Sequence, residues 1–265
     1  MGGAERTARR RRQQQASGAR NAVASARSNK PDRIKLVVGA VLAVLIAAFV
    51  VGGVLLTNAS KKETEERGVA VAQSAADYPV RRDGGVVVAG KDDAKVTLDV
   101  YEDFLCPGCG SFEKRDSDTI EQKLTAGTLR IRYHMLPMLN NLSDPPGYSL
   151  DAANAALAAA DAGRFPAFHK SLFADQPVEG GRGWSDDQLI ALGAKLGISS
   201  SDFADAVRTG RHDSLVRDVF RKAGETPHLQ ADNNGQKVFV GTPTIANGTT
   251  VLDIGDPGWL TALTG

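Results

Sequence analysis

The sequence predicts an α/β domain with an inserted block of helices, preceded by a single membrane-spanning helix. Strand patterns come before a long run of helical patterns, and β character returns near the C-terminus. Ahead of these patterns lies an apolar run of 23 residues, 34–56, and about 20 are enough to cross a bilayer as a helix. We therefore divide the chain into an arm (1–33), a span (34–56), a linker (57–84) and a folded domain (85–265), with the helical insertion at about 147–225.

The arm is strongly basic. It carries nine arginines and lysines against two acidic residues and almost no large apolar residue, so we expect it to be disordered. A basic flank on the N-terminal side of a span places that side in the cytoplasm and the rest of the chain outside it. We therefore interpret the arm as a topology determinant that contacts anionic lipids, in preference to a nucleic-acid-binding segment.

The apolar run 34–56 is expected to remain as a signal anchor. It is longer than the roughly 7–15 apolar residues of a cleaved signal peptide, and no cysteine follows it that could take a lipid. The linker that comes next is charged and rich in small residues, which is typical of a solvated tether.

The first half of the folded domain predicts strand, strand, helix, strand. Residues 86–90 form a short apolar run, and residues 95–104 alternate apolar with polar side chains, as a half-buried strand does. Residues 109–127 have helical spacing and end at a glycine, and residues 128–136 alternate again.

The second half predicts five helices and then a return to strands. The helical patterns cover residues 148–163, 164–176, 184–197, 199–210 and 212–224. Residues 237–254 have β character, with Asn247-Gly248 as a hairpin turn, and a last helix is expected after Pro257.

The only two cysteines, Cys106 and Cys109, lie between the second predicted strand and the first predicted helix. A zinc site would need two further ligands, but there is no third cysteine and the four histidines show no paired spacing. A structural disulfide across so short a loop would stabilise little, because loop-closure stabilisation grows with loop length. We favour a redox pair: the helix N-terminus lowers the pKa of Cys106, the nucleophile, and Cys109 acts as the resolving thiol.

Two short motifs add a family resemblance. "DFLCPGC" (103–109) and the distant "GTPT" (241–244) resemble the DsbA-like thioredoxin superfamily, in its extracytoplasmic branch with Asp-x-x-Cys-Pro-x-Cys; the segment 163–177 is similar to that branch's helical insertion. The resemblance implies a thioredoxin fold from Val86 to the C-terminus. It also implies that Pro243 is a cis-proline and that Thr242 and Pro243 form a backbone platform for substrate.

The supporting residues only partly match this family. Pro107 suits the first turn of a helix, where its missing N–H costs little. Gly108 replaces the histidine of Cys-Pro-His-Cys members, which implies a less oxidising pair. Asp103 matches the branch, although a solvated loop carboxylate is an equal alternative.

A buried acid often stands six residues before the first cysteine in thioredoxin-like proteins, but that position here is Val100. Asp99 is expected on the other face of the strand, so Glu102 and Asp103 are the alternatives for a proton-relay carboxylate. We expect His169 to be a structural core residue. His134 ends a strand and is a candidate to approach the cysteines.

These observations predict a membrane-tethered, extracytoplasmic thiol:disulfide oxidoreductase. The favoured activity is oxidation of exported proteins through Cys106 and Cys109, with a DsbB-like or VKOR-like membrane oxidase as the implied partner. We expect no metal or organic cofactor and no nucleic-acid partner. A reductase or isomerase remains an alternative, as does a non-catalytic anchored binding module with an inert disulfide. The composition, rich in Ala, Gly, Arg and Asp, suggests a GC-rich bacterium.

Overall fold

The computed structural model describes residues 67–264. Among these residues, no helix combines the length and the apolar character needed to cross a membrane. The predicted arm (1–33) and the predicted span (34–56) lie outside the described residues.

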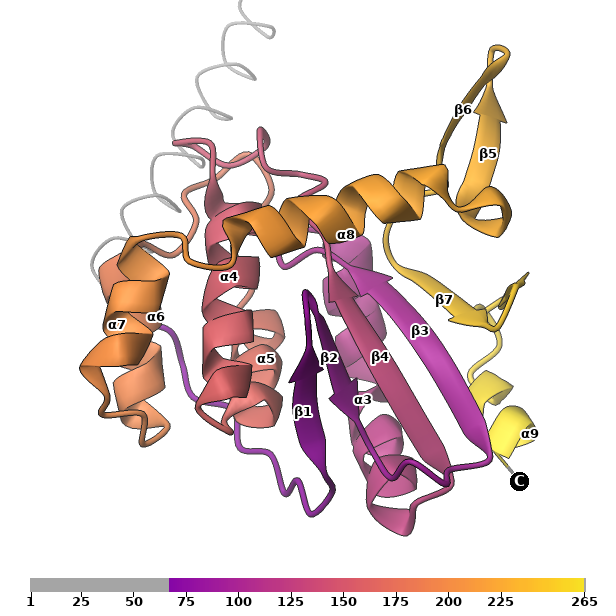
Figure 1. The fold of residues 1–265 in the computed structure, drawn as a ribbon, viewed down its shortest axis with the longest axis horizontal. Helices are drawn as coiled ribbons and strands as arrows, with labels where there is room; N and C mark the ends of the chain where they lie inside the picture. Colours follow the sequence, from indigo (N-terminus) through magenta and orange to yellow (C-terminus); the bar gives the residue numbers. More distant parts are fainter. Residues whose placement is uncertain (1–66, 265) are drawn as a thin grey trace, which may run out of the picture. The chain divides into compact units, whose positions relative to one another are not determined.

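A six-stranded sheet forms the centre of the described domain, in the order β1-β2-β4-β3-β7-β8 (Figure 1). Its strands are β1 (Val80–Asp83), β2 (Val86–Ala89), β3 (Val96–Glu102), β4 (Leu129–Met135), β7 (Thr244–Asn247) and β8 (Thr250–Val251). β3 and β4 are parallel, and the other neighbouring strands are antiparallel. The predicted α/β class with a helical insertion is therefore confirmed.

The unit β3-α3-β4 carries the cysteines. α3 (Pro107–Ala126) connects the two parallel strands, as a parallel pair requires. It ends at Gly127, whose φ of 75° is left-handed and whose N–H donates to Leu124 O, so glycine is favoured there. Because Leu98 and Val100 of β3 are buried, this strand presents its apolar residues to the core as predicted.

The helical insertion lies between β4 and β7. It consists of α4 (Tyr148–Asp161), α5 (Phe165–Ala174), α6 (Asp186–Lys195), α7 (Ser201–Arg208) and α8 (Asp213–Glu225). Alanine-rich α4 is buried along most of its length, and α5, α6, α7 and α8 all pack against it. Small side chains allow such close packing on several sides of one helix.

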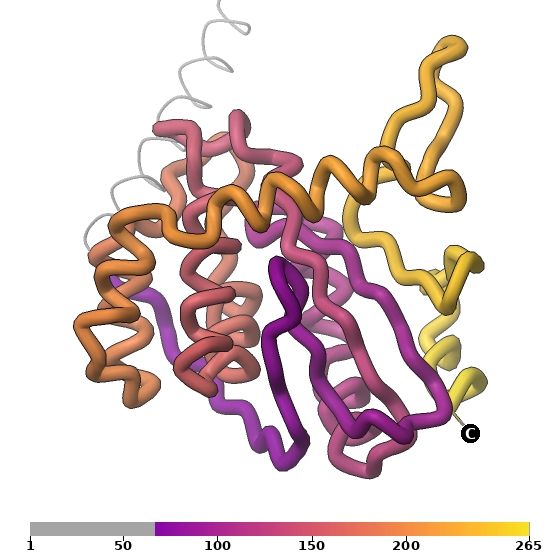
Figure 2. The backbone as a smooth tube through the Cα atoms, viewed as in Figure 1, coloured from indigo at the N-terminus to yellow at the C-terminus, as the bar shows by residue number. Residues whose placement is uncertain are grey.

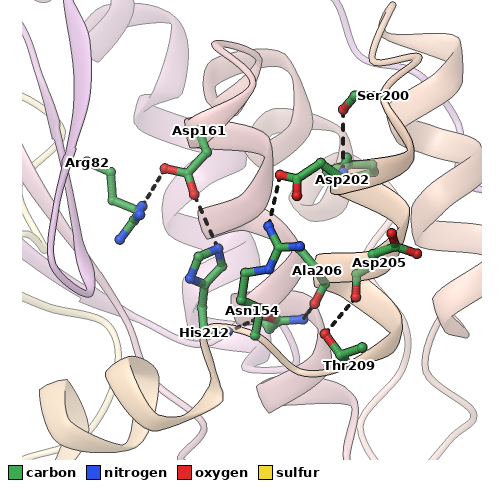
Figure 3. Close-up of polar contacts among 11 residues, drawn as sticks. Arg82, Asn154, Asp161, Ser200, Asp202, Asp205, Ala206, Thr209 and His212 are labelled. Atoms are coloured by element: carbon green, nitrogen blue, oxygen red, sulfur yellow. Dashed lines mark hydrogen bonds and ion pairs between the residues drawn. The ribbon is translucent and has the colours of Figure 1, made fainter.

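Polar contacts join the insertion to the edge of the sheet (Figure 3). Arg82 of β1 donates from Nε to Asp161 Oδ1 at 2.6 Å, and the other oxygen of Asp161 lies 3.2 Å from His212 Nε2. Asn154 accepts from the His212 backbone N–H at 2.9 Å and donates to Ala206 O at 3.0 Å. These contacts connect β1, α4 and the turn between α7 and α8.

The end of the predicted linker differs from the expectation, because it is part of the domain. Residues 80–83 form β1, and the segment before them runs along the helical insertion (Figure 2). Arg67 makes two hydrogen bonds to Asp175, at 2.6 and 2.7 Å, and Ala72 N donates to Ser171 Oγ at 2.9 Å. β1 contains two arginines, so its sequence is typical of a solvated segment. The strand nevertheless pairs with β2 along its length.

A second, two-stranded sheet stands apart from the main sheet (Figure 1). β5 (Gln230–Asn233) and β6 (Gln236–Phe239) are joined by Asn234 and Gly235, both with positive φ. β5 was not predicted, because its sequence is polar. β6, β7 and β8 fall within the predicted β region. The chain ends in α9 (Trp259–Thr264), as expected after Pro257.

Candidate active site

Cys106 and Cys109 lie where β3 gives way to α3. Cys106 is the N-cap residue of α3 with an extended backbone, and Pro107 is at the first helical position. Both cysteines are free thiols. Cys106 is 8% exposed and Cys109 is 0% exposed, so solvent and partner molecules reach Cys106 only.

The pKa of Cys106 is lowered to about 5. The largest cause is a hydrogen bond with the Cys109 side chain; burial opposes it, and the Thr242 side chain and the N–H groups of Cys109 and Gly108 lower the pKa further. Backbone N–H groups without a helical partner stabilise an anion at a helix N-terminus. Cys106 is therefore a thiolate at neutral pH, the form that attacks disulfides.

The pKa of Cys109 moves in the opposite direction. Burial raises it far above the ordinary value for a thiol, and the side chain of Cys106 and the charge of Glu102 add to the increase. The two thiols therefore differ: Cys106 loses its proton readily, and Cys109 holds its proton.

The loop at 241–244 lies directly against the cysteine pair. Cys106 Sγ is 3.3 Å from Thr242 O, and the peptide bond between Thr242 and Pro243 is cis, the geometry expected of this loop. A Cβ on Gly108 would lie 3.1 Å from Pro243 Cδ, which is tighter than normal packing. Glycine at position 108 thus allows the close approach of the two segments.

Asp103 is buried, so the alternative of a solvated loop carboxylate is wrong. Its Oδ1 accepts from Leu105 N at 2.8 Å and its Oδ2 from Leu139 N at 2.7 Å. Burial raises its pKa to about 6, against the effect of these N–H donors. The carboxylate therefore holds the cysteine loop against the segment after β4.

Gln176 is a site residue that we did not single out from the sequence. Its Nε2 donates to Phe104 O at 3.1 Å and to Cys106 O at 2.8 Å. A Cβ on Gly110 would lie 2.1 Å from the Gln176 side-chain oxygen. The helical insertion thus fixes the backbone of the cysteine loop, and the resemblance of segment 163–177 was the one signal that pointed to it.

Asp99 faces away from the cysteines, as predicted. It pairs with Arg132 and lies 2.7 Å from His134 Nε2. His134 also stacks on Tyr101, with 4.3 Å between ring centroids. The idea that His134 approaches the cysteines is therefore wrong, because this side chain is engaged on the other face of the sheet.

Glu102 lies on the inner face, together with Glu113 and His169. His169 Nε2 is 2.5 Å from Glu102 Oε1, and all three residues are buried. Within the described part of the chain, this is the one group of three such side chains whose ligand atoms lie close enough together, within 4.8 Å, to hold a metal ion. Because the ring of His169 is already hydrogen-bonded to Glu102, we assign no metal to the group.

A family model described as thioredoxin matches residues 82–250, more than half of the chain. The chain belongs to the thioredoxin family. Among solved structures, reduced DsbA of Mycobacterium tuberculosis is 26% identical with a TM-score of 0.57, and the match covers 68% of this chain and 91% of that one. Reduced DsbG of the same species is 26% identical with a TM-score of 0.55, covering 71% and 86%. The DsbA-like resemblance is therefore confirmed.

This thioredoxin-family protein is also similar to part of a larger protein. The serine/threonine-protein kinase PknE of M. tuberculosis is 28% identical over 197 residues, which are 72% of this chain and 33% of the kinase. The chain thus spans about one third of the length of that curated relative.

Proposed function

We propose that this DsbA-like protein is a protein thiol–disulfide oxidoreductase that acts outside the cytoplasm. One observation carries the proposal: a low-pKa thiol, Cys106, lies 3.3 Å from the backbone oxygen of Thr242 and next to a shielded partner, Cys109. This arrangement presents one reactive sulfur beside a backbone edge that an extended peptide can pair with. The 26% identity to DsbA and to DsbG of M. tuberculosis supports the same class of activity.

The chemistry proceeds by thiol–disulfide exchange. With the Cys106–Cys109 disulfide formed, a substrate thiolate attacks Cys106 Sγ, the Cys106–Cys109 bond breaks, and Cys109 leaves and takes up a proton. A second substrate thiolate then attacks the substrate sulfur of the mixed disulfide, and Cys106 leaves as a thiolate. The substrate loses two electrons and the enzyme gains them.

Oxidation of substrates is the favoured direction. Stabilising the Cys106 thiolate stabilises the reduced enzyme, and this makes its disulfide a stronger oxidant. A reductase or isomerase is the second candidate, because DsbG of M. tuberculosis is as similar to this chain as DsbA is.

We further propose that residues 34–56 anchor the protein in the cell membrane with its N-terminus in the cytoplasm. The sequence pattern alone supports this part. Exported proteins with thiols are the proposed substrates, and a DsbB-like or VKOR-like membrane oxidase is the proposed electron acceptor. The redox-active disulfide serves without a metal or organic cofactor.

The test is a trapping experiment. Cys109→Ala leaves Cys106 reactive but removes the thiol that would release a bound partner, so we expect it to accumulate mixed disulfides with exported proteins. Cys106→Ala is the control and should trap nothing. If Cys109→Ala captures no partner and the wild-type protein neither oxidises a dithiol peptide nor reduces insulin, the protein is a binding module instead.

A further inference from the structure

We propose that the segment 67–72 positions the cysteine loop through a latch and thereby sets the reactivity of Cys106. The latch consists of the ion pair between Arg67 and Asp175 together with Gln176, the residue that follows Asp175. The proposal rests on the proposed thiol–disulfide exchange, in which Cys106 is the sulfur that meets partner proteins. Arg67 and Asp175 are positioning residues, because they act through Gln176 rather than on the sulfur.

The carboxylate of Asp175 is held by the segment 67–72. Arg67 donates from Nη1 to Asp175 Oδ2 at 2.6 Å and from Nη2 to Oδ1 at 2.7 Å, and Ala70 N donates to Oδ2 at 2.8 Å. A guanidinium that binds both carboxylate oxygens fixes direction as well as distance. Burial would raise the pKa of Asp175, but the hydrogen bonds from Arg67 and Ala70 lower it below its ordinary value. The carboxylate is therefore ionised at neutral pH.

Trp184 holds both partners of this ion pair. The guanidinium of Arg67 lies over the indole ring, 5.0 Å from its centroid, which is the preferred place for a cation on an aromatic face. Trp184 Nε1 donates to Asp175 O at 3.1 Å, and the tryptophan is buried. The side chain and the backbone carbonyl of Asp175 are thus both fixed.

Further contacts dock the segment on the insertion. Val69 is buried in the core. Gln188 of α6 donates from Nε2 to Arg67 O at 2.7 Å, and Lys195 of the same helix donates from Nζ to Val69 O at 3.0 Å. A single exposed ion pair would contribute little, but here backbone contacts and a buried side chain support it. The segment is therefore fixed relative to the insertion.

The latch reaches the cysteine loop through Gln176. The carbonyl of Asp175 and the N–H of Gln176 belong to one planar peptide group, so fixing the first orients the second. Gln176 Nε2 then donates to Phe104 O at 3.1 Å and to Cys106 O at 2.8 Å. The same amide lies against Gly110, where an added Cβ would come within 2.1 Å of its oxygen.

The orientation of this loop decides how well the thiolate is stabilised. The hydrogen bond with the Cys109 side chain lowers the pKa of Cys106 most, and the N–H groups of Cys109 and Gly108 lower it further. These N–H groups face the sulfur only while the first turn of α3 keeps its orientation. Gln176 holds the carbonyl of Cys106, which also accepts from Gly110 N at 3.1 Å. Opening the latch therefore raises the pKa of Cys106 and leaves less thiolate.

A through-space effect of the two charges has a different signature. Loss of the positive charge of Arg67 would disfavour the thiolate, whereas loss of the negative charge of Asp175 would favour it. Opening the latch disfavours the thiolate in both cases. The sign of the effect of an Asp175 variant therefore separates the two explanations.

The test is a titration of the ultraviolet thiolate absorbance in the reduced full chain. The other titratable groups that interact with Cys106 are Cys109, which holds its proton, and Asp103, which gives no thiolate signal. In Arg67→Gln and in Asp175→Asn we expect the ionisation constant of Cys106 to fall by about two- to ten-fold, the range that the net contribution of one hydrogen bond spans.

Further variants show whether the two residues act as one unit. Combining Arg67→Gln with Asp175→Asn should lower the constant no more than either change alone, because both open the same latch. Arg67→Lys keeps the charge but not the bidentate geometry and should give an intermediate value. Arg221→Gln is the matched control. It removes an exposed arginine that pairs with Glu225 at 2.9 Å within α8, and it should titrate as wild type.

An unchanged or higher ionisation constant in Asp175→Asn would overturn the latch, and so would single effects that add in the double variant. Either result leaves the proposed function in place. A wild-type protein that exchanges with no disulfide, such as oxidised glutathione, would overturn the proposed function. The titration would still decide on the latch.

A second measurement needs no variant of the latch to fold. If the closed latch stabilises the thiolate, the thiolate stabilises the closed latch by the same factor. The indole N–H of Trp184 reports closure, since it donates to Asp175 O. At one pH, its deuterium exchange should be about two- to ten-fold faster in Cys106→Ala, which has no thiolate, than in the reduced wild-type protein. Equal exchange rates in the two proteins contradict the latch.

Discussion

Cys106 and Cys109 are separated by two residues, yet the fold pushes their pKa values in opposite directions. Cys106 is at the helix N-terminus, where hydrogen bonds lower its pKa to about 5. Cys109 is one turn further into α3, where burial raises its pKa. Two identical side chains thus differ in acidity, as the proposed roles of nucleophile and resolving thiol require.

The low pKa of Cys106 predicts a pH-dependent stability of the reduced protein. Folding lowers this pKa from 9.0 to about 5, so the stabilisation is fully present above pH about 9 and is lost as pH falls through about 5. The unfolding free energy of the reduced form, relative to the oxidised form, should therefore rise from pH 5 to 9. Denaturant titrations of both forms measure it, and Cys106→Ala serves as the control. A flat difference across this range would mean that the thiolate is not stabilised.

Asp103 is predicted to be a stability determinant. Asp103→Ala leaves the N–H groups of Leu105 and Leu139 buried without an acceptor. At about 1–3 kcal/mol for each orphaned donor, the unfolding free energy should fall by about 2–6 kcal/mol. Asp187→Ala, at a side chain that is 83% exposed, should change it by less than about 1 kcal/mol. Equal losses in the two variants would refute this role.

At the scale of elements, the sequence predicts most of the domain because the patterns are strong there. β3 alternates apolar with polar side chains, although both of its faces are buried from Leu98 to Glu102, and β4 alternates in and out of the core. α4 is alanine-rich, and α6 has a complete capping box at Ser185 and Gln188. β1 and β5 were not predicted, and the reason is physical. Each is a short edge strand made mostly of polar residues, so backbone pairing rather than side-chain burial defines it.

The candidate site was predictable only where the chain itself carries a local motif. Cys106, Cys109 and Pro243 lie in such motifs. Gln176 and His169 reach the site from the helical insertion, and tertiary packing alone brings them there. Glu102 and Asp103 stay alternative candidate acids, and only the fold shows that both are buried.

Gln176 is predicted to link the insertion to the cysteine loop. Gln176→Ala removes the donors to Phe104 O and Cys106 O, so we expect a loss of about 1–2 kcal/mol in unfolding free energy. The rate of alkylation of Cys106 should also change, since its backbone is less firmly held. Gln122→Ala, at an exposed glutamine of α3, should affect neither quantity, and an unaltered alkylation profile in Gln176→Ala would contradict the link.

The segment before β1 is predicted to behave as part of the folded domain. Ala70 N donates to Asp175 at 2.8 Å, and Ala72 N donates to Ser171. Amides in these hydrogen bonds should exchange with deuterium more slowly than those of an unstructured chain. Exchange of residues 70–72 at the unstructured rate would restore the original expectation of a free linker.

At the scale of the whole molecule, the sheet brings together two motifs that are far apart in the sequence. Tyr101 of β3 pairs with Thr244 of β7 in antiparallel register. This pairing sets the cysteine loop after β3 beside the loop with Thr242 and Pro243 before β7. The insertion then covers the same site from the side with Gln176 and His169. The cysteine pair, the proposed substrate platform and the side chains that cover them therefore come from three separate stretches of the chain.

The most direct test of this account is the equilibrium of the Cys106–Cys109 pair with glutathione redox buffers, read by mass spectrometry after acid quench and alkylation. The account predicts a reversible two-electron couple with a potential clearly above the roughly −270 mV of thioredoxin. A couple at or below that value would contradict the favoured oxidase activity. A pair whose redox state does not follow the buffer would contradict the redox site itself.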